Sequence, residues 1–152
     1  NPGHEYGYRD FPDAQIASVC DLAKDICARH EIPPWRVLAH SDVAPARKRD
    51  PGELFPWNLL AAAGVGDHVD PEPVTGGRYL QEGDQGQPVE ALQSMLALFG
   101  YEVEIDGVYD TQTRLAVTAF QRHFRPDRVD GVADMSTITT LHRLLQNRPA
   151  PG

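Results

Sequence analysis

A repeated turn-and-helix pattern in the second half of the chain limits its possible folds more than any other feature. The pattern Asp-Gly-Val-x-Asp-x-x-Thr occurs at residues 106–113 and again at residues 130–137. Asp-Gly favours a tight turn, and the second aspartate of each copy, Asp110 or Asp134, is a natural N-cap for a following helix. The spaced acidic ligands of a calcium loop are absent, so we interpret both copies as turns and not as metal loops.

Apolar residues at helical spacing follow each turn and also precede the first one. This period predicts an all-α, three-helix unit over residues 79–147. A core this small occupies most of the apolar positions, so we expect His123 and His142 on the surface. The apolar positions are Val89, Leu92, Leu96 and Phe99, then Ala116, Val117, Phe120 and Phe124, then Ile138, Leu141, Leu144 and Leu145.

The first part of the chain shows a different order of elements. Helical spacing predicts a helix over residues 13–30, and the two prolines after Ile32 end it. Residues 35–39 are mostly apolar and predict a short strand, and residues 54–63 predict a second helix. Helix, strand and helix in this order indicate an α/β fold, with part of a mixed sheet and its helices, over residues 1–64.

Composition and spacing exclude several classes of structure and partner. Residues 65–78 are rich in Pro, Gly and acidic side chains without periodicity, so we interpret them as a linker. The formal net charge of −8 argues against a nucleic-acid partner, and no apolar run is long enough to cross a membrane. Cys20 and Cys27 lie about 10 Å apart along one helix, too far for a disulfide. We expect a monomer.

The polar residues after the predicted strand are candidate metal ligands. His40 follows the strand directly, and neutral imidazole and carboxylate groups are ligands that zinc accepts. Asp42 is two residues further on, so on a continuing strand it would face the same way as His40. Asp50 is fixed by the turn-forming Pro51 and Gly52. Strand geometry alone slightly favours Asp42 over Asp50 as the second ligand.

Residues 38–57, with His-Ser-Asp followed by Arg-Lys-Arg-Asp-Pro-Gly, closely resemble the second half of the zinc motif of N-acetylmuramoyl-L-alanine amidases. The resemblance is to amidases of the bacteriophage-lysozyme-like fold, nearest to the AmiD group. It implies zinc as cofactor with His40 and Asp50 as ligands, and it gives Asp42 a supporting role. It also implies that Lys48 polarises the scissile amide or stabilises the tetrahedral intermediate. Arg47 is a candidate for holding a stem-peptide carboxylate or for a structural salt bridge.

The same resemblance implies that parts of the amidase site lie outside this sequence. Residues 1–13 resemble the loop that follows the strand with the catalytic glutamate, and that strand and the first zinc histidine have no match here. His4 is therefore expected beside the substrate cleft and not as a ligand. Two hypotheses result: a zinc amidase, or a non-catalytic peptidoglycan-binding protein. A zinc peptidase acting on the stem peptide is a weaker third alternative.

The second half closely resembles a three-helix peptidoglycan-binding domain, over about residues 79–146. The resemblance implies peptidoglycan or a muropeptide as partner, and a place in the bacterial cell envelope, in the periplasm or at the outer membrane. The matching positions are Gly83, Gly86, Val89, Leu92 and Gln93, Gly100 and Tyr101, the two Asp-Gly-Val turns, and Ala119, Phe120 and Gln121.

Overall fold

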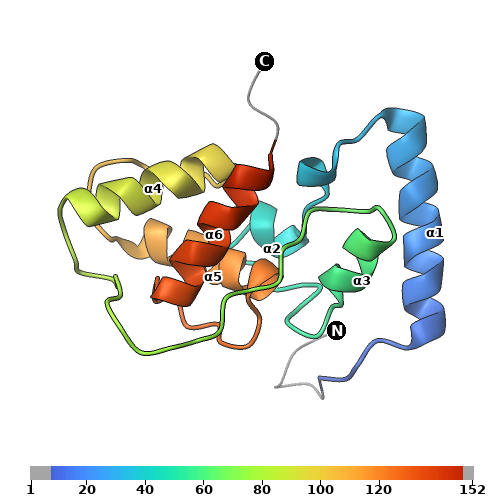
Figure 1. Cartoon of the computed structure of the whole chain (residues 1–152), viewed down its shortest axis with the longest axis horizontal. Helices are drawn as coiled ribbons and strands as arrows, with labels where there is room; N and C mark the ends of the chain where they lie inside the picture. Colours follow the sequence, from blue (N-terminus) through green and yellow to red (C-terminus); the bar gives the residue numbers. More distant parts are fainter. Residues whose placement is uncertain (1–7, 149–152) are drawn as a thin grey trace.

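The structure is a computed structural model that describes residues 8–148, and its regular elements are helices (Figure 1). Helix α1 lies at one side of the molecule, α4, α5 and α6 gather at the other, and α2 and α3 lie between them. The elements in chain order are α1 (Asp13–His30), the 3₁₀ helix η2 (Pro34–Arg36), α2 (His40–Val43), α3 (Trp57–Ala62), α4 (Gln87–Phe99), α5 (Thr111–Phe124) and α6 (Met135–Asn147).

The expected α/β fold of the first part, with its mixed sheet, is wrong for the described residues. Between residues 8 and 148 there is no sheet, and the only strand-like pairs are two isolated bridges in the second half. Residues 37–39 are outside any helix or strand, although burial alternates along them: Leu38 is 54% exposed and Ala39 only 4%. A strand needs a partner to complete its backbone hydrogen bonds, and none of the described segments pairs with this one.

The first hydrophobic cluster joins α1 to α3 and to the segment before α2. Two turns of α1 contribute Ile16 and Cys20, and α3 contributes Trp57 and Leu60. The cluster is completed by Ala39 and Val65. Cys20 is buried inside it, and both cysteines are free thiols, as the spacing predicted.

The second cluster is the core of α4, α5 and α6, and it confirms the expected all-α unit. Each of the two repeated turns is followed by a capped helix. Asp110 accepts a hydrogen bond from the Thr113 amide, and Asp134 from the Thr137 amide, both at 2.8 Å. The buried members are Val69, Val89, Leu92, Leu96, Phe99, Tyr101, Tyr109, Ala116, Val117, Ala119, Phe120, Phe124, Ala133, Leu141 and Leu144.

A buried glutamine holds each Asp-Gly-Val turn. In the second turn, Gln121 Oε1 accepts from the amides of Asp130 and Gly131 at 3.0 and 2.9 Å. Its Nε2 donates to the Val132 carbonyl at 2.8 Å. The same Nε2 also lies within hydrogen-bond distance of Asp130 Oδ1 and Thr137 Oγ1. The first turn is held in the same way by Gln93, which contacts Asp106, Gly107, Val108 and Thr113.

The glycines of these two turns give a matched pair for a stability prediction. Gly107 and Gly131 both have φ of 73°, which costs an L-residue roughly 1–2 kcal/mol. A Cβ at Gly131 would lie 2.8 Å from side-chain atoms of Arg114 and Thr118, whereas at Gly107 the nearest atom is 3.4 Å away. We expect Gly131→Ala to lower the free energy of unfolding by about 3 kcal/mol and Gly107→Ala to lower it by about 1–2 kcal/mol. Urea unfolding of both variants measures this difference, and equal losses would contradict it.

The segment between the two clusters is packed against the second half. Ser136 Oγ donates to the Glu72 carbonyl at 2.6 Å, and the Glu72 amide donates to Thr140 Oγ1 at 3.1 Å. Arg143 on α6 pairs with the Glu72 carboxylate at 3.0 Å. Glu72 is therefore held against α6, and residues 65–78 have no helix or strand of their own. In the described range, the helices are all too short or too polar to span a bilayer.

Candidate metal site

His40 is the first residue of α2, a helix of a single turn. The Ala39 amide donates to Asp42 Oδ2 at 2.8 Å, which fixes the start of this turn. The Ser41 amide donates to the Asp50 carbonyl at 3.1 Å and so joins the turn to the segment that carries the second expected ligand. The local structure therefore brings residues 40 and 50 together without a strand.

The two expected zinc ligands lie side by side. His40 Nδ1 is 3.1 Å from Asp50 Oδ2, and the side chains are 46% and 53% exposed. Slight burial raises the pKa of the Asp50 carboxyl. The hydrogen bonds from its own amide and from His40, together with the electrostatic influence of His40 and of Lys48, more than offset this and lower that pKa. The pair is accessible, and its carboxylate is held in the charged form that a metal ion requires.

This donor pair fits zinc in type but is incomplete in number. Zinc sites in hydrolases usually have three protein ligands of the His and Asp/Glu type and leave a fourth position open. Among the residues that the structure describes, no group of three or more His, Cys, Asp and Glu is arranged to hold a metal ion. His40 and Asp50 can thus supply two ligands, and a complete site needs at least one more donor.

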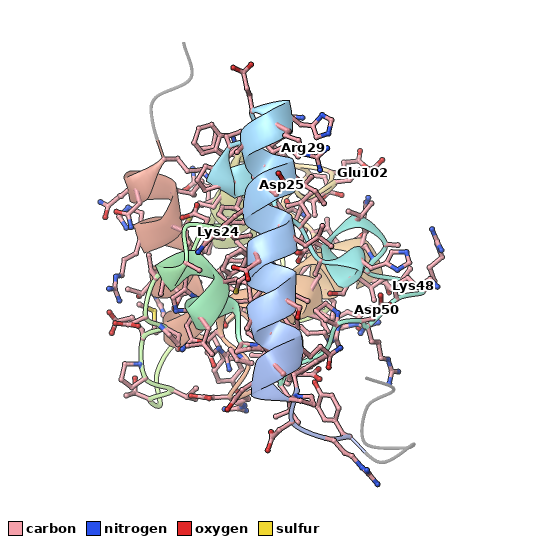
Figure 2. All side chains as sticks on the ribbon, turned by 90° about the vertical axis from the view of Figure 1, so that its right-hand side faces the viewer. Lys24, Asp25, Arg29, Lys48, Asp50 and Glu102 are labelled. Atoms are coloured by element: carbon pink, nitrogen blue, oxygen red, sulfur yellow. The ribbon has the colours of Figure 1, made fainter. Side chains whose placement is uncertain are left out.

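The other expected site residues lie in different places. Lys48 is half-buried, its charge acts on Asp50, and the two lie on the same side of the molecule in Figure 2. Arg47 is exposed, and among residues 8–148 no ion pair or side-chain hydrogen bond involves it. His4 lies outside the described residues. The roles of these three side chains remain predictions.

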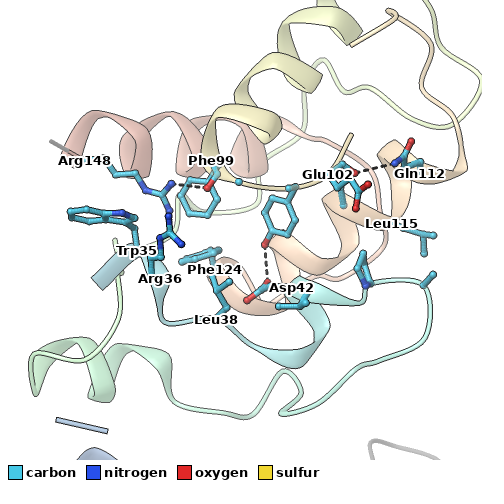
Figure 3. A pocket seen from close by; sticks show the side chains of 16 residues that line it. Trp35, Arg36, Leu38, Asp42, Phe99, Glu102, Gln112, Leu115, Phe124 and Arg148 are labelled. Atoms are coloured by element: carbon cyan, nitrogen blue, oxygen red, sulfur yellow. Dashed lines mark hydrogen bonds between the residues drawn. The ribbon is translucent and has the colours of Figure 1, made fainter. Parts of the chain in front are cut away.

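Asp42 does not face the same way as His40, because the two lie on a helical turn and not on a strand. Its Oδ1 accepts from the Tyr101 hydroxyl at 2.8 Å, and its Oδ2 is 2.6 Å from His123 Nδ1. Asp42 therefore points into the junction with the second half of the chain (Figure 3). The strand-based argument for Asp42 as a ligand is wrong.

His123 is buried, and the expectation that it lies on the surface is wrong. Its ring stacks between Trp57 and Phe124, with ring centroids 3.8 Å away on each side. The sequence contained a weak signal, since His123 lies three residues after the core residue Phe120 and hence on the same face of α5. His142 is exposed, as expected.

A second polar contact joins α5 to the segment after Asp50. Arg122 Nε donates to Glu53 Oε1 at 2.8 Å, and the Tyr8 hydroxyl donates to Glu53 Oε2 at 3.0 Å. Burial would raise the pKa of the Glu53 carboxyl. The pKa is nevertheless lowered, because the carboxylate accepts hydrogen bonds from Arg122, the Glu53 amide and Tyr8 and lies beside the positive charge of Arg122. Burial raises the pKa of Tyr8 to about 12.

The lowered pKa of Glu53 predicts a pH dependence of stability. A carboxyl with a lowered pKa stabilises the fold above its unfolded pKa of about 4.3, and this contribution is lost as the pH falls through the folded pKa. We therefore expect the stability difference between the native chain and Glu53→Gln to be largest above pH 5 and to shrink towards pH 3. Chemical unfolding at several pH values measures it. Arg122→Met should remove the same dependence, and a difference that grows on acidification would contradict the assignment.

A cavity of about 700 Å³ lies between the two halves of the chain. Its walls come from residues 35–46 on one side and mainly from residues 99–102 and 112–124 on the other (Figure 3). Neither His40 nor Asp50 lines it. The cavity is therefore distinct from the candidate metal site.

Comparison with known proteins defines the class of both halves. Residues 1–53 match the model of the N-acetylmuramoyl-L-alanine amidase family, and this range includes His40, Lys48 and Asp50. Residues 85–141 match the model of a putative peptidoglycan binding domain. The chain thus joins part of an amidase domain to a peptidoglycan-binding domain.

Individual relatives make the assignment more specific. The chain is 43% identical to the N-acetylmuramoyl-L-alanine amidase AmiD of Escherichia coli (strain K12) over 141 residues, which is 91% of this chain and 50% of that protein. It is 31% identical to a putative N-acetylmuramoyl-L-alanine amidase, RC0497, of Rickettsia conorii over 125 residues, which is 76% of this chain and 46% of the relative. The chain is therefore AmiD-like, and it spans about half the length of these relatives.

Solved structures agree with this assignment. The structure of E. coli AmiD in complex with its substrate superposes with a TM-score of 0.72 at 38% identity, covering 92% of this chain and 54% of AmiD. The structure of AmpDh3 from Pseudomonas aeruginosa gives a TM-score of 0.73 at 28% identity, covering 95% of this chain and 57% of AmpDh3. Both halves of the chain are included in each superposition, because each covers more than nine-tenths of it.

Proposed function

We propose that the chain provides two zinc ligands and the substrate-binding module of an amidase that cleaves the bond between N-acetylmuramic acid and L-alanine. The observation that carries the proposal is the pairing of His40 with Asp50 at 3.1 Å inside the segment that matches the amidase family. The substrate class is supported by AmiD, whose structure holds anhydro-N-acetylmuramic acid-L-Ala-D-gamma-Glu-L-Lys as substrate. AmpDh3 has also been solved with an anhydromuramic pentapeptide.

The chemistry is divided among this chain's residues as follows. Zinc held by His and Asp ligands supplies an activated water at neutral pH. His40 and Asp50 hold the ion, and Lys48 stabilises negative charge that develops on the amide oxygen. Arg47 binds a stem-peptide carboxylate in a bidentate contact, and His4 borders the cleft. A second histidine and a glutamate complete the site in the amidases that the chain resembles, and no residue in the described range fills those positions.

In this proposal the second half keeps the amidase part near its polymeric substrate. We assign residues 1–64 to the amidase part, 65–78 to the linker and 79–147 to the peptidoglycan-binding domain. Binding by one module raises the effective concentration of substrate at the other. The protein would act in the cell envelope on peptidoglycan or muropeptides, as a monomer.

A non-catalytic peptidoglycan-binding protein is the second candidate. The observation that favours it is the lack of a third metal donor among residues 8–148. In that case, the amidase part would serve only as a docking surface. The two candidates agree on cell-wall binding and differ on metal and hydrolysis.

One experiment separates the two functions. The chain is sedimented with purified sacculi in the presence of zinc, and the zinc that pellets with the protein is measured by elemental analysis. The amidase proposal predicts bound zinc in the pellet that is lost in His40→Ala and kept in Arg49→Ala, an exposed neighbour of Asp50 with no assigned role. Sedimentation of the native chain with no more zinc than His40→Ala would support the binding protein instead.

A further inference from the structure

Two consecutive residues of α5 reach the two segments that carry the candidate metal ligands. His123 contacts Asp42, two residues after His40, and Arg122 contacts Glu53, three residues after Asp50. We propose that Arg122 and His123, together with Tyr101, are positioning residues for the metal site, so that the peptidoglycan-binding domain is a structural part of that site. This inference goes beyond substrate tethering and rests on the proposed zinc function only for its metal-binding consequence.

The contact at Asp42 is buried, and it joins the second half of the chain to α2, the helix to which Asp42 belongs. The side chains of His123 and Asp42 are 1% and 5% exposed, and their atoms approach to 2.6 Å. Tyr101 donates to the other oxygen of the same carboxylate at 2.8 Å. The oxygen that faces His123 also accepts from the amide of Ala39, directly before His40. A shift of α5 or Tyr101 therefore moves the carboxylate that fixes the start of the His40 turn.

The contact at Glu53 acts on the other ligand segment. The Arg122 and Glu53 side chains are mostly buried and 2.8 Å apart. The hydroxyl of Tyr8, which also donates to Glu53, accepts from the amide of Leu54 at 2.7 Å. The backbone that follows Gly52 is thus attached to α5 through the Glu53 carboxylate.

The two contacts converge on a single backbone hydrogen bond. The Ser41 amide donates to the Asp50 carbonyl, and Ser41 is buried. This bond sets the distance between the residues that carry the imidazole and the carboxylate. Partly buried, charge-assisted hydrogen bonds are stronger and more directional than exposed ones, so the paired α5 contacts are suited to holding it. A domain attached only as a tether would not require them.

The first readout is independent of metal. Amide hydrogen exchange of Ser41 is measured by NMR in the zinc-free full chain and in three variants that keep side-chain bulk: Tyr101→Phe, His123→Phe and Arg122→Met. Arg143→Met is the control, because it removes an arginine contact from the second half to Glu72, outside both ligand segments. We expect Ser41 exchange to accelerate about tenfold or more in all three variants where they fold, and to stay unchanged in the control.

The second readout is zinc affinity, followed through the ring signals of His40 at a temperature where every variant is folded. Loss of groups that orient metal ligands typically weakens binding about 10–100-fold, and we expect this for Arg122→Met and Tyr101→Phe but not for Arg143→Met. If His123→Phe fails to fold, these two variants carry the test.

The outcomes separate the positioning role of Tyr101, Arg122 and His123 from the zinc proposal. Faster Ser41 exchange in a native chain that binds no zinc would support the positioning role and contradict the zinc function. Unchanged Ser41 exchange and unchanged zinc affinity in Arg122→Met and Tyr101→Phe would overturn the positioning role. Equal acceleration in Arg143→Met would also overturn it, because the effect would then reflect general loss of stability.

Discussion

Replacing Gln121 with leucine is expected to lower the free energy of unfolding by about 4 kcal/mol, because buried donors and acceptors are left without partners. The side chain is fully buried and keeps most of its volume in the variant, so the cost comes from hydrogen bonds and not from a cavity. The amide of Gly131, which is buried, loses its acceptor, and the carbonyl of Val132 loses its donor. Urea or thermal unfolding measures the loss.

The internal repeat provides a matched variant and a matched control. Gln93→Leu removes the equivalent contacts from the first turn and should cost a similar amount. Gln112→Leu should cost less than about 0.5 kcal/mol, because this glutamine is exposed and its side chain makes one hydrogen bond within residues 8–148, to the Glu102 carbonyl. A loss below 1 kcal/mol in both Gln93→Leu and Gln121→Leu would contradict the role assigned to these side chains.

The second large effect is expected at Arg125, a fully buried arginine at the end of α5. Its guanidinium lies 3.1 Å from both carboxylate oxygens of Asp134 and also donates to the Arg128 carbonyl and to Thr137 Oγ1. Arg125→Met leaves the Asp134 charge buried without its partner. We expect a loss of about 3–5 kcal/mol, measured by equilibrium unfolding.

A double-mutant cycle tests the electrostatic origin of this loss. Asp134→Asn removes the charge but keeps an oxygen that can accept from the Thr137 amide and cap α6. In the Arg125→Met background, Asp134→Asn should therefore recover part of the lost stability. If Asp134→Asn destabilises that background as much as it destabilises the native chain, the loss at Arg125 comes from packing and not from an unpaired charge.

The parts of the fold that depend on local sequence could be predicted. The two turns, the caps at Asp110 and Asp134 and the three helices of the second half follow from residue type and spacing within a few positions. His40 and Asp50 were expected together from the motif around them, and the structure places them 3.1 Å apart. The turns and helices needed only information from nearby in the chain, whereas the choice of Asp50 over Asp42 came from the resemblance to the amidase motif.

Features that depend on distant contacts could not be predicted. The apolar segment at residues 35–39 has the composition of a strand, but strand formation depends on a partner that no described segment provides. The side-chain partners of Asp42 are 59 and 81 residues away, at Tyr101 and His123, so nothing near residue 42 indicates them. Residue type does not distinguish a buried glutamine such as Gln121 from a surface glutamine. Only the hydrogen-bond partners that the fold provides do so.

The central claim is that His40 and Asp50 together bind zinc, and a zinc titration of the full chain followed by NMR of the histidine rings tests it most directly. The account predicts that the His40 signals shift on zinc addition, that those of exposed His142 do not, and that Asp50→Ala abolishes the His40 response. The claim would be contradicted if the His40 signals did not shift on zinc addition, or if they shifted equally in the native chain and in Asp50→Ala.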